Sequence, residues 1–291
     1  MFQNLQAIVK LARPHQYIKN LFIFLPLFFA LKIGDLPLLL NTALAFIAFS
    51  MAASGVYILN DYLDIEDDKR HPKKKYRPLA SGAVSKRQGV LLMTSFIVGA
   101  IVLVCCVSMD VAYVLIAYVM MNFAYSMKLK HIAILDVNII AIGFVLRLYA
   151  GSFITDTKLS VWIIVITFLL ALFLALAKRR DDVLLFEKTG TKARKVIDGY
   201  NLQFLDISMA IMAAVVIVSY VLYTTSVDVI ARVGSDYLFV TAFFVILGIL
   251  RYLQISFVLK NSGSPTKIVL SDTFIQATIT GWLITFGWIL Y

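Results

Sequence analysis

Long apolar runs recur along this chain, and they restrict its fold more than any other feature of the sequence. A transmembrane helix needs roughly 20 predominantly apolar residues in a row. Hydrophobic residues make up 61% of the sequence and charged residues 15%, whereas soluble domains have about 45–50% and about 25%. The sequence therefore predicts an all-α integral membrane protein.

The apolar runs predict about nine transmembrane helices, with eight and ten as alternative counts, in a single transmembrane domain, residues 1–291. Their approximate ranges are 18–33, 38–60, 88–107, 111–127, 132–154, 159–177, 205–226, 236–259 and 269–290. No good cleavage site follows the first run, so it is interpreted as a retained helix rather than a signal peptide. Two connections are long, about 61–87 and 178–204.

Lys and Arg are concentrated in alternate connections between these runs. Cytoplasmic loops of membrane proteins carry an excess of Lys and Arg, so this pattern predicts a cytoplasmic N-terminus and, with nine spans, a C-terminus outside. Both long loops then face the cytoplasm. The predicted location is the inner (plasma) membrane, with the active site on its cytoplasmic side.

Two classes of protein do not fit the sequence. The net charge of +10 lies in the connections between apolar runs, which argues against nucleic-acid binding. The two cysteines, Cys105 and Cys106, are adjacent within an apolar run, so they give neither a disulfide framework nor a zinc-binding spacing. A homo-oligomer is compatible with the sequence, which leaves the oligomeric state open.

An acidic stretch follows the second apolar run. If the helix continues through it, Asp61, Asp64 and Asp68 fall at i, i+3 and i+7, on one face. Like charges at this spacing destabilise a helix unless a cation lies between them. Mg²⁺ binds one or two carboxylates together with water and phosphate oxygens. The spacing therefore favours a metal–diphosphate site, and a solvated charged loop is the simpler alternative.

A basic segment follows these acids directly, from Lys69 to Arg77. Lys73 and Arg77 are interpreted as phosphate-binding residues, because Arg and Lys are the side chains that most often bind phosphate.

A second charged cluster lies at the inner end of the sixth predicted span and contains Lys178, Arg179, Asp181 and Asp182. Lys178 and Asp182 are i, i+4 neighbours, so a simple ion pair explains them. Their position also suggests a second metal or phosphate contact. Two acidic clusters on one side of the membrane would hold a Mg²⁺–diphosphate between them, and the metal would act as a Lewis acid for departing pyrophosphate.

Further polar residues lie in or beside the spans. Tyr125 and Lys130 end the fourth span, where they are either interfacial anchors or groups directed at a substrate oxygen. Arg147 lies deep in the fifth span, where a charge is costly, so it is predicted to face a polar cavity and bind an anion. Arg251 lies nearer the inner face and can reach the interface. The remaining acids near helix starts, Asp206 and Asp272 among them, are explained by the helix dipole.

The pattern Asn60-Asp61-x-x-Asp64-x-x-x-Asp68 resembles the UbiA superfamily of intramembrane prenyltransferases, and the resemblance covers nearly the whole chain. Other pieces resemble the decaprenyl-phosphate phosphoribosyltransferase branch most closely. These pieces are residues 13–20, 71–82, 125–126, 129–130, 136–137, 143–147 and 178–179, with Arg194 and Tyr200.

This resemblance implies a reaction in which an oxygen of a polyprenyl phosphate lipid attacks C1 of phosphoribosyl pyrophosphate, with Mg²⁺ as cofactor. By matching position, it implies a metal motif and a set of phosphate-binding groups. The metal motif is Asn60, Asp61, Asp64 and Asp68, joined by Asp182, and Asp61, Asp64, Asp68 and Lys130 are the predicted catalytic residues. The predicted substrate-binding residues are Lys19, Asn20, Lys73, Arg77, Tyr125, Arg147, Lys178 and Arg179. The branch usually has Glu where this chain has Asp182, so Asp181 is an alternative ligand.

Two other functions remain open at this point. Transfer of a prenyl group from its diphosphate to an aromatic acceptor needs the same metal-held leaving group. A transporter would use Arg147 and the acids as a substrate pathway, but transporter sites usually lie at the midplane between repeats, whereas here the charges lie at one face.

Overall fold

The computed structural model of the protein describes residues 2–71, 74–190, 195–260 and 265–290. Every regular element in these ranges is a helix, which confirms the predicted all-α class. The chain forms two compact units. The first contains Met1–Ile139 and Gly143–Leu159, and the second contains Ile140–Ile142 and Ser160–Tyr291.

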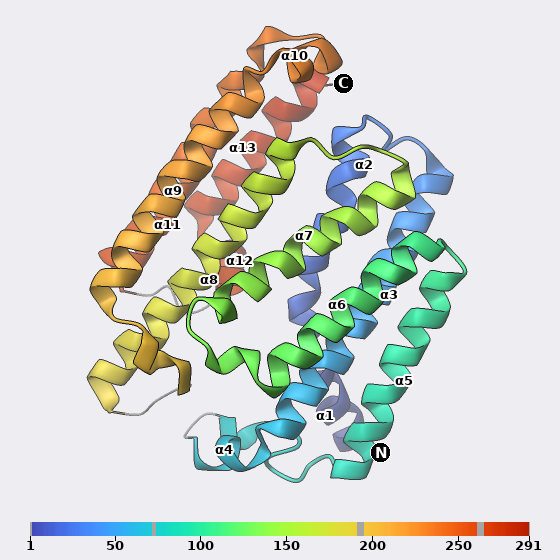
Figure 1. Ribbon diagram of the computed structural model, residues 1–291, viewed down its shortest axis with the longest axis vertical. Helices are drawn as coiled ribbons and strands as arrows, with labels where there is room; N and C mark the ends of the chain where they lie inside the picture. Colours follow the sequence, from blue (N-terminus) through green and yellow to red (C-terminus); the bar gives the residue numbers. More distant parts are fainter. Residues whose placement is uncertain (1, 72–73, 191–194, 261–264, 291) are drawn as a thin grey trace. The chain divides into compact units, whose positions relative to one another are not determined.

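The first unit is built around helix α3 (Figure 1). Its elements in chain order are α1 (Phe2–Ala12), η1 (Pro14–Phe24), α2 (Leu25–Phe29), α3 (Leu36–Leu63), α4 (Ile65–Arg70), η2 (Lys74–Tyr76), α5 (Lys86–Cys105), α6 (Met109–Met127), η3 (Leu129–His131) and α7 (Leu135–Thr155). Helix α3 packs against α1, η1, α5 and α6.

Local sequence signals fix the start of these helices. The Asp35 side chain accepts a hydrogen bond from the Leu38 N–H and so caps α3, and Ser85 with Gln88 forms a capping box at the start of α5. At about 1.5 Å per residue, the 28 residues of α3 are about 42 Å long, whereas the hydrocarbon core of a bilayer is about 30 Å thick. The end of α3 that carries the acidic motif can therefore extend out of the hydrocarbon.

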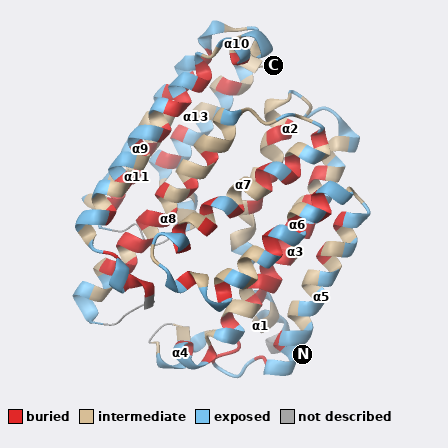
Figure 2. Ribbon diagram, viewed as in Figure 1, coloured by how far each residue is buried: buried red, intermediate tan, exposed pale blue. Residues whose placement is uncertain are grey.

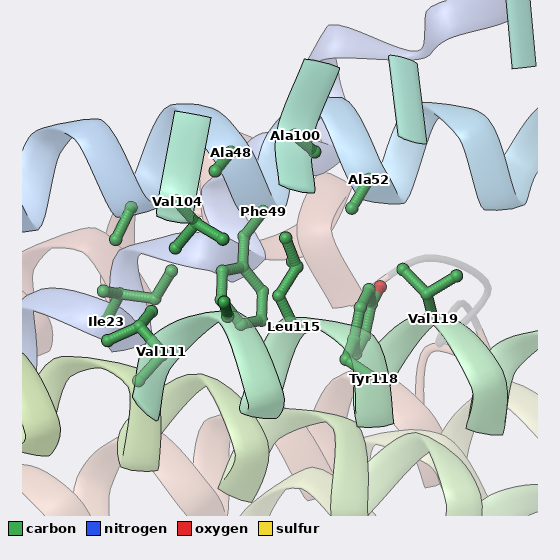
Figure 3. Packing of buried hydrophobic residues seen from close by; sticks show 13 residues of the cluster. Ile23, Ala48, Phe49, Ala52, Ala100, Val104, Val111, Leu115, Tyr118 and Val119 are labelled. Carbon is green, nitrogen blue, oxygen red and sulfur yellow. The ribbon is translucent and has the colours of Figure 1, made fainter. Parts of the chain in front are cut away.

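An apolar core joins α3, α5 and α6 in the first unit (Figure 3). Phe49 of α3 and Leu115 of α6 are fully buried in it, and Figure 2 shows buried residues along both helices. A close approach of η1 to α7 requires a glycine, because a Cβ on Gly151 would lie 2.0 Å from the Ile23 carbonyl oxygen. This approach brings η1 beside the middle of α7, where Arg147 lies.

The second unit is a set of helices packed in series. Its elements are α8 (Val161–Thr189), η4 (Lys195–Gly199), α9 (Leu202–Thr224), α10 (Val227–Val233), η5 (Asp236–Thr241), α11 (Ala242–Phe257), α12 (Pro265–Ser271) and α13 (Thr273–Leu290). Helix α8 packs on α9, α9 on α11, and α11 on α13. Helix α8 continues to Thr189, where Gly190 in the left-handed conformation ends it, so residues 178–189 are helical.

Eight helices in the described part of the chain are long and apolar enough to cross a membrane. They match eight of the nine predicted spans and agree with the prediction of an integral membrane protein. The first predicted span, residues 18–33, instead lies in η1 and the five-residue α2. Pro26 has no N–H to donate and falls at the start of α2, so a single regular α-helix does not run through this segment.

Candidate active site

The acidic motif lies at the junction of α3 and α4. Helix α3 ends at Leu63 and α4 begins at Ile65, with Asp64 between them at φ −96° and ψ 8°. The i to i−4 hydrogen bonds continue across the break, from the Asp64 N–H to the Asn60 carbonyl and from the Asp68 N–H to the Asp64 carbonyl. The motif therefore keeps nearly helical spacing, and its carboxylates divide between two sets of cations.

Two arginines hold the first pair of carboxylates. The Arg77 guanidinium donates from Nη1 to Asp61 Oδ1 at 2.9 Å and to Asp68 Oδ2 at 2.7 Å. Arg13 donates to the same Asp61 oxygen at 2.6 Å and lies 5.2 Å from the centre of the Tyr57 ring. Both acids are only 2% exposed. Burial raises the pKa of the Asp68 carboxyl above its usual value, and the Arg77 charge opposes that rise.

Lys130 holds the second pair of motif side chains. Its Nζ donates to Asp64 Oδ1 at 2.6 Å and to Asn60 Oδ1 at 3.2 Å. The Asn60 amide nitrogen in turn donates to Asp64 Oδ2 at 3.1 Å. Lys130 lies on η3 and is buried, so an ammonium group from beyond the end of α6 is fixed against the motif. Asn60, Asp64 and Lys130, each a predicted site residue, are therefore in direct contact with one another.

The donor atoms of the motif suit a hard cation. They are carboxylate and amide oxygens, which Mg²⁺ prefers. Within the described residues, no three His, Cys, Asp or Glu side chains gather closely enough to hold a metal by themselves. Mg²⁺ usually takes only one or two carboxylates and completes its shell with water and phosphate oxygens. The residues present thus fit a Mg²⁺ ion that is bound jointly with a phosphate.

A buried arginine lies farther along the first unit. Arg147 donates to Asn20 Oδ1 at 2.6 Å, to the Gly143 carbonyl at 2.6 Å and to the Tyr118 hydroxyl at 3.0 Å. Its guanidinium carbon lies 4.7 Å from the centre of the Tyr118 ring. All of these groups are neutral, and no carboxylate pairs with Arg147 among the described residues. A buried cation with only neutral partners keeps its full charge available to an anion.

The other predicted substrate-binding residues of this unit have different surroundings. Lys19 lies on η1 and is partly buried, and Tyr125 lies near the end of α6 and is partly buried. Asn20 is buried and also donates to the Ser50 hydroxyl at 2.9 Å. Lys73, and Arg194 of the family resemblance, lie outside the described residues.

The second charged cluster belongs to the second unit, on the part of α8 that continues beyond its apolar run. Asp182 accepts from Arg179 Nη1 at 2.9 Å and lies 3.3 Å from Lys178 Nζ. The i, i+4 ion pair expected from the sequence is thus confirmed. Arg179 is 1% exposed, so this cluster is built around a buried guanidinium and not around a free carboxylate.

Two further arginines of the second unit, Arg180 and Arg251, pair with carboxylates of the same unit. Arg180 is buried and donates to Asp206 Oδ1 at 2.5 Å and to the Ser256 carbonyl at 2.6 Å. Arg251 was predicted to reach the membrane interface. It also has a protein partner, because it pairs with Asp272 at 2.8 Å. Asp272 also accepts from the Ile275 N–H and caps α13. These pairs join neighbouring helices.

Reasoning from the sequence did not assign a role to three residues of these networks. They are Arg13, Tyr118 and Arg180. Arg13 belongs to the segment that resembles the family, and its φ of 55° is a conformation that few non-glycine residues adopt. The proline directly after Arg13 was the sequence feature that could have drawn attention to this residue. Nothing in the local sequence distinguished Tyr118 or Arg180 from other aromatic and basic residues of the spans.

Known proteins are similar to this chain over nearly its whole length. Residues 20–277 match the UbiA prenyltransferase family. A decaprenyl-phosphate phosphoribosyltransferase of Mycolicibacterium smegmatis is 30% identical over 295 residues, which cover 98% of this chain and 92% of that protein. The protein of the same name from Mycobacterium tuberculosis is 31% identical over 293 residues, covering 98% of this chain and 94% of that protein.

A solved structure shares the fold. It is a UbiA homolog from Archaeoglobus fulgidus bound to DMAPP and Mg²⁺, with a TM-score of 0.69 and 18% sequence identity. The match covers 96% of this chain and 98% of that chain. At this level of identity the likeness concerns the arrangement of helices alone.

Proposed function

Because the chain belongs to the UbiA prenyltransferase family, we propose that it transfers a 5-phosphoribosyl group from phosphoribosyl pyrophosphate to a polyprenyl phosphate, such as decaprenyl phosphate, and releases pyrophosphate. Relatives named decaprenyl-phosphate phosphoribosyltransferase match nearly the full length of the chain, which supports this choice within the family. The observation that carries the proposal is the contact of the Asn60–Asp68 motif with Arg13, Arg77 and Lys130.

The reaction matches the chemistry of these residues. An oxygen of the lipid phosphate forms a bond to C1 of the ribose while the bond from C1 to the pyrophosphate oxygen breaks. Negative charge develops on the leaving pyrophosphate, and fixed cations next to that charge lower the barrier. The lipid phosphate is already an anion, so no dedicated general base is needed. A bound Mg²⁺ supplies Lewis-acid neutralisation of the same leaving group.

The proposed roles combine the contacts described above with the positions that match the family pattern. Asn60, Asp61, Asp64 and Asp68 supply oxygen ligands for the metal. Arg77 and Lys130 contact these acids. They can therefore donate hydrogen bonds to a bound pyrophosphate and still lie beside the metal ligands. Lys19, Asn20, Tyr125 and Arg147 bind substrate phosphate or ribose oxygens. Lys73, Lys178 and Arg179 bind phosphate, and Asp182 binds metal.

The membrane setting supports this division of substrates. We propose nine spans, with the η1–α2 segment as the first, a cytoplasmic N-terminus and an external C-terminus. The protein lies in the inner (plasma) membrane with the motif facing the cytoplasm. A water-soluble polyanionic donor then approaches a basic surface, where the positive field raises its local concentration. The lipid acceptor stays in the bilayer and presents only its phosphate.

A transfer assay tests the function. Purified protein in lipid nanodiscs receives Mg²⁺, a polyprenyl phosphate and phosphoribosyl pyrophosphate labelled in the ribose. We expect label in the lipid phase together with released pyrophosphate. Asp64→Ala should abolish this turnover without changing membrane insertion, whereas the matched control Asp67→Ala, which replaces an exposed acid on α4, should retain it. Normal turnover by Asp64→Ala would rule out the metal assignment.

Prenyl transfer to an aromatic acceptor is the second candidate. The solved homolog with the same fold is bound to DMAPP, a prenyl diphosphate. Both reactions have a pyrophosphate leaving group, so the acids and cations described above serve either one. Consumption of a prenyl diphosphate with an aromatic acceptor, without label transfer from phosphoribosyl pyrophosphate, would favour this candidate.

A further inference from the structure

Helix α1 is too short to cross a membrane, and it lies beside the acidic motif. Its 11 residues are about 16 Å long, roughly half the thickness of the hydrocarbon core. It packs on α3, and Leu11 shares a buried cluster with Ile58, just before the motif, and with Ile65, within it. Helix α1 is therefore fixed at the same end of α3 as Asp61 and Asp64 (Figure 1).

The described side chains of α1 form three faces. Ala7 and Leu11 pack into the core of the first unit, and Gln6 and Lys10 are exposed. Leu5 and Val9 form a third face, because residues four apart lie one above the other on a helix. They are 59% and 50% exposed. An amphipathic helix with core, polar and exposed apolar faces is typical of a helix lying in a membrane interface.

The C-terminal end of α1 is connected to both arginines that bind the motif. Lys10 Nζ donates to the Tyr76 carbonyl at 3.1 Å, and Arg77 is the next residue. Arg13 follows α1 directly and binds Asp61. A displacement of α1 would therefore move the backbone that carries each of these guanidinium groups.

We propose that α1 is an interfacial helix that binds a phospholipid surface through Leu5 and Val9. By this contact it positions Arg13 and Arg77 at the acidic motif. The chemistry of α1 suits an anionic lipid surface, because its sequence contains Lys10 and neither Asp nor Glu. The lipid contact does not depend on which transferase reaction the protein performs.

A second copy of the chain fits this face less well. A stable protein interface buries roughly 1,200–2,000 Å² in total, and two side chains on an 11-residue helix offer only a small part of that area. Two copies would also bring basic segments together, including Lys69, Lys74 and Lys75 on α4 and η2. A lipid surface removes both difficulties.

Site-directed fluorescence tests the proposal in the full-length protein. Cys105 and Cys106 are first replaced by Ser, since both are exposed, and single cysteines are introduced as Leu5→Cys, Val9→Cys or Gln6→Cys. Each variant is labelled with NBD and reconstituted in nanodiscs of phosphatidylcholine and phosphatidylglycerol. Quenching is then measured with doxyl-labelled lipid and with aqueous iodide.

We expect doxyl lipid to quench NBD at positions 5 and 9 at least twofold more than at position 6, and iodide to give the reverse order. Equal iodide quenching at all three positions would refute the proposal. Protection of positions 5 and 9 from both quenchers would also overturn it, because protein would then cover the face. Two labelling positions keep the test valid if one variant fails to fold.

To test the positioning step, Lys10→Met should raise the KM for the phosphorylated donor, while doxyl lipid still quenches NBD more strongly at position 5 than at position 6. Gln6→Met is the control for a change on the same exposed face. An unchanged KM in Lys10→Met would refute the link between α1 and Arg77.

Discussion

Replacement of Arg77 by Met tests whether the cations of the motif neutralise buried carboxylates. Arg77 Nη1 bridges Asp61 and Asp68 at 2.9 Å and 2.7 Å. A hydrogen bond to a charged group contributes about 1.5–3 kcal/mol, and loss of one partner of a fully buried ion pair costs about 3–5 kcal/mol. The Arg77 side chain is 25% exposed, and Asp61 keeps its bond to Arg13. We therefore expect Arg77→Met to lower the free energy of unfolding by about 2 kcal/mol, roughly 30-fold in the equilibrium constant.

The measurement is the unfolding of the purified protein by SDS in mixed micelles, followed by tryptophan fluorescence. Lys75→Met is the matched control, because it removes an equal charge from an exposed position two residues away and should change stability by no more than about 0.5 kcal/mol. Millimolar Mg²⁺ should restore more stability to Arg77→Met than to the unmodified protein, since a divalent cation can neutralise the same carboxylates. Equal stability of Arg77→Met and Lys75→Met would refute the reasoning.

Three further predictions concern single residues. Lys130→Met should lower kcat about 100- to 1,000-fold, the usual effect of removing a preorganised charge-stabilising donor, while Lys128→Met, at an exposed position, should leave label transfer close to normal; equal rates would contradict this role. Arg147→Lys should raise the KM for a phosphorylated substrate at least about tenfold, because one charge-assisted hydrogen bond, about 1.5 kcal/mol or more, is lost; an unchanged KM would argue for a purely structural role. The bond from Arg251 holds the pKa of Asp272 below its usual value, so this pair stabilises the fold above about pH 4 and loses that effect as the pH falls through the lowered value. Asp272→Asn keeps an acceptor for the cap of α13, so the difference in thermal midpoint from the unmodified protein should be present at pH 7 and shrink as the pH falls below the usual Asp pKa of about 4; a constant difference would exclude the ion pair as its cause.

The sequence by itself determined the class of fold and most of its helices. Backbone N–H and C=O groups find no water in lipid, so an apolar run that crosses the membrane must form a helix, in which these groups bond to each other. Eight of the nine predicted runs match long helices. Short-range charge contacts were also readable, since helix geometry fixes the neighbours at i+3 and i+4. The Lys178–Asp182 pair is such a case.

The tertiary structure alone decided which distant residues complete the motif. Arg13 reaches Asp61 across 48 positions of sequence, and Lys130 reaches Asp64 across 66. Periodicity tells which face of a helix is polar, but the partner of that face depends on how the helices pack. The first predicted span shows the same limit, because its hydropathy indicated a membrane helix while Pro26 and the packing of η1 on α7 gave a 3-10 helix followed by a short α-helix.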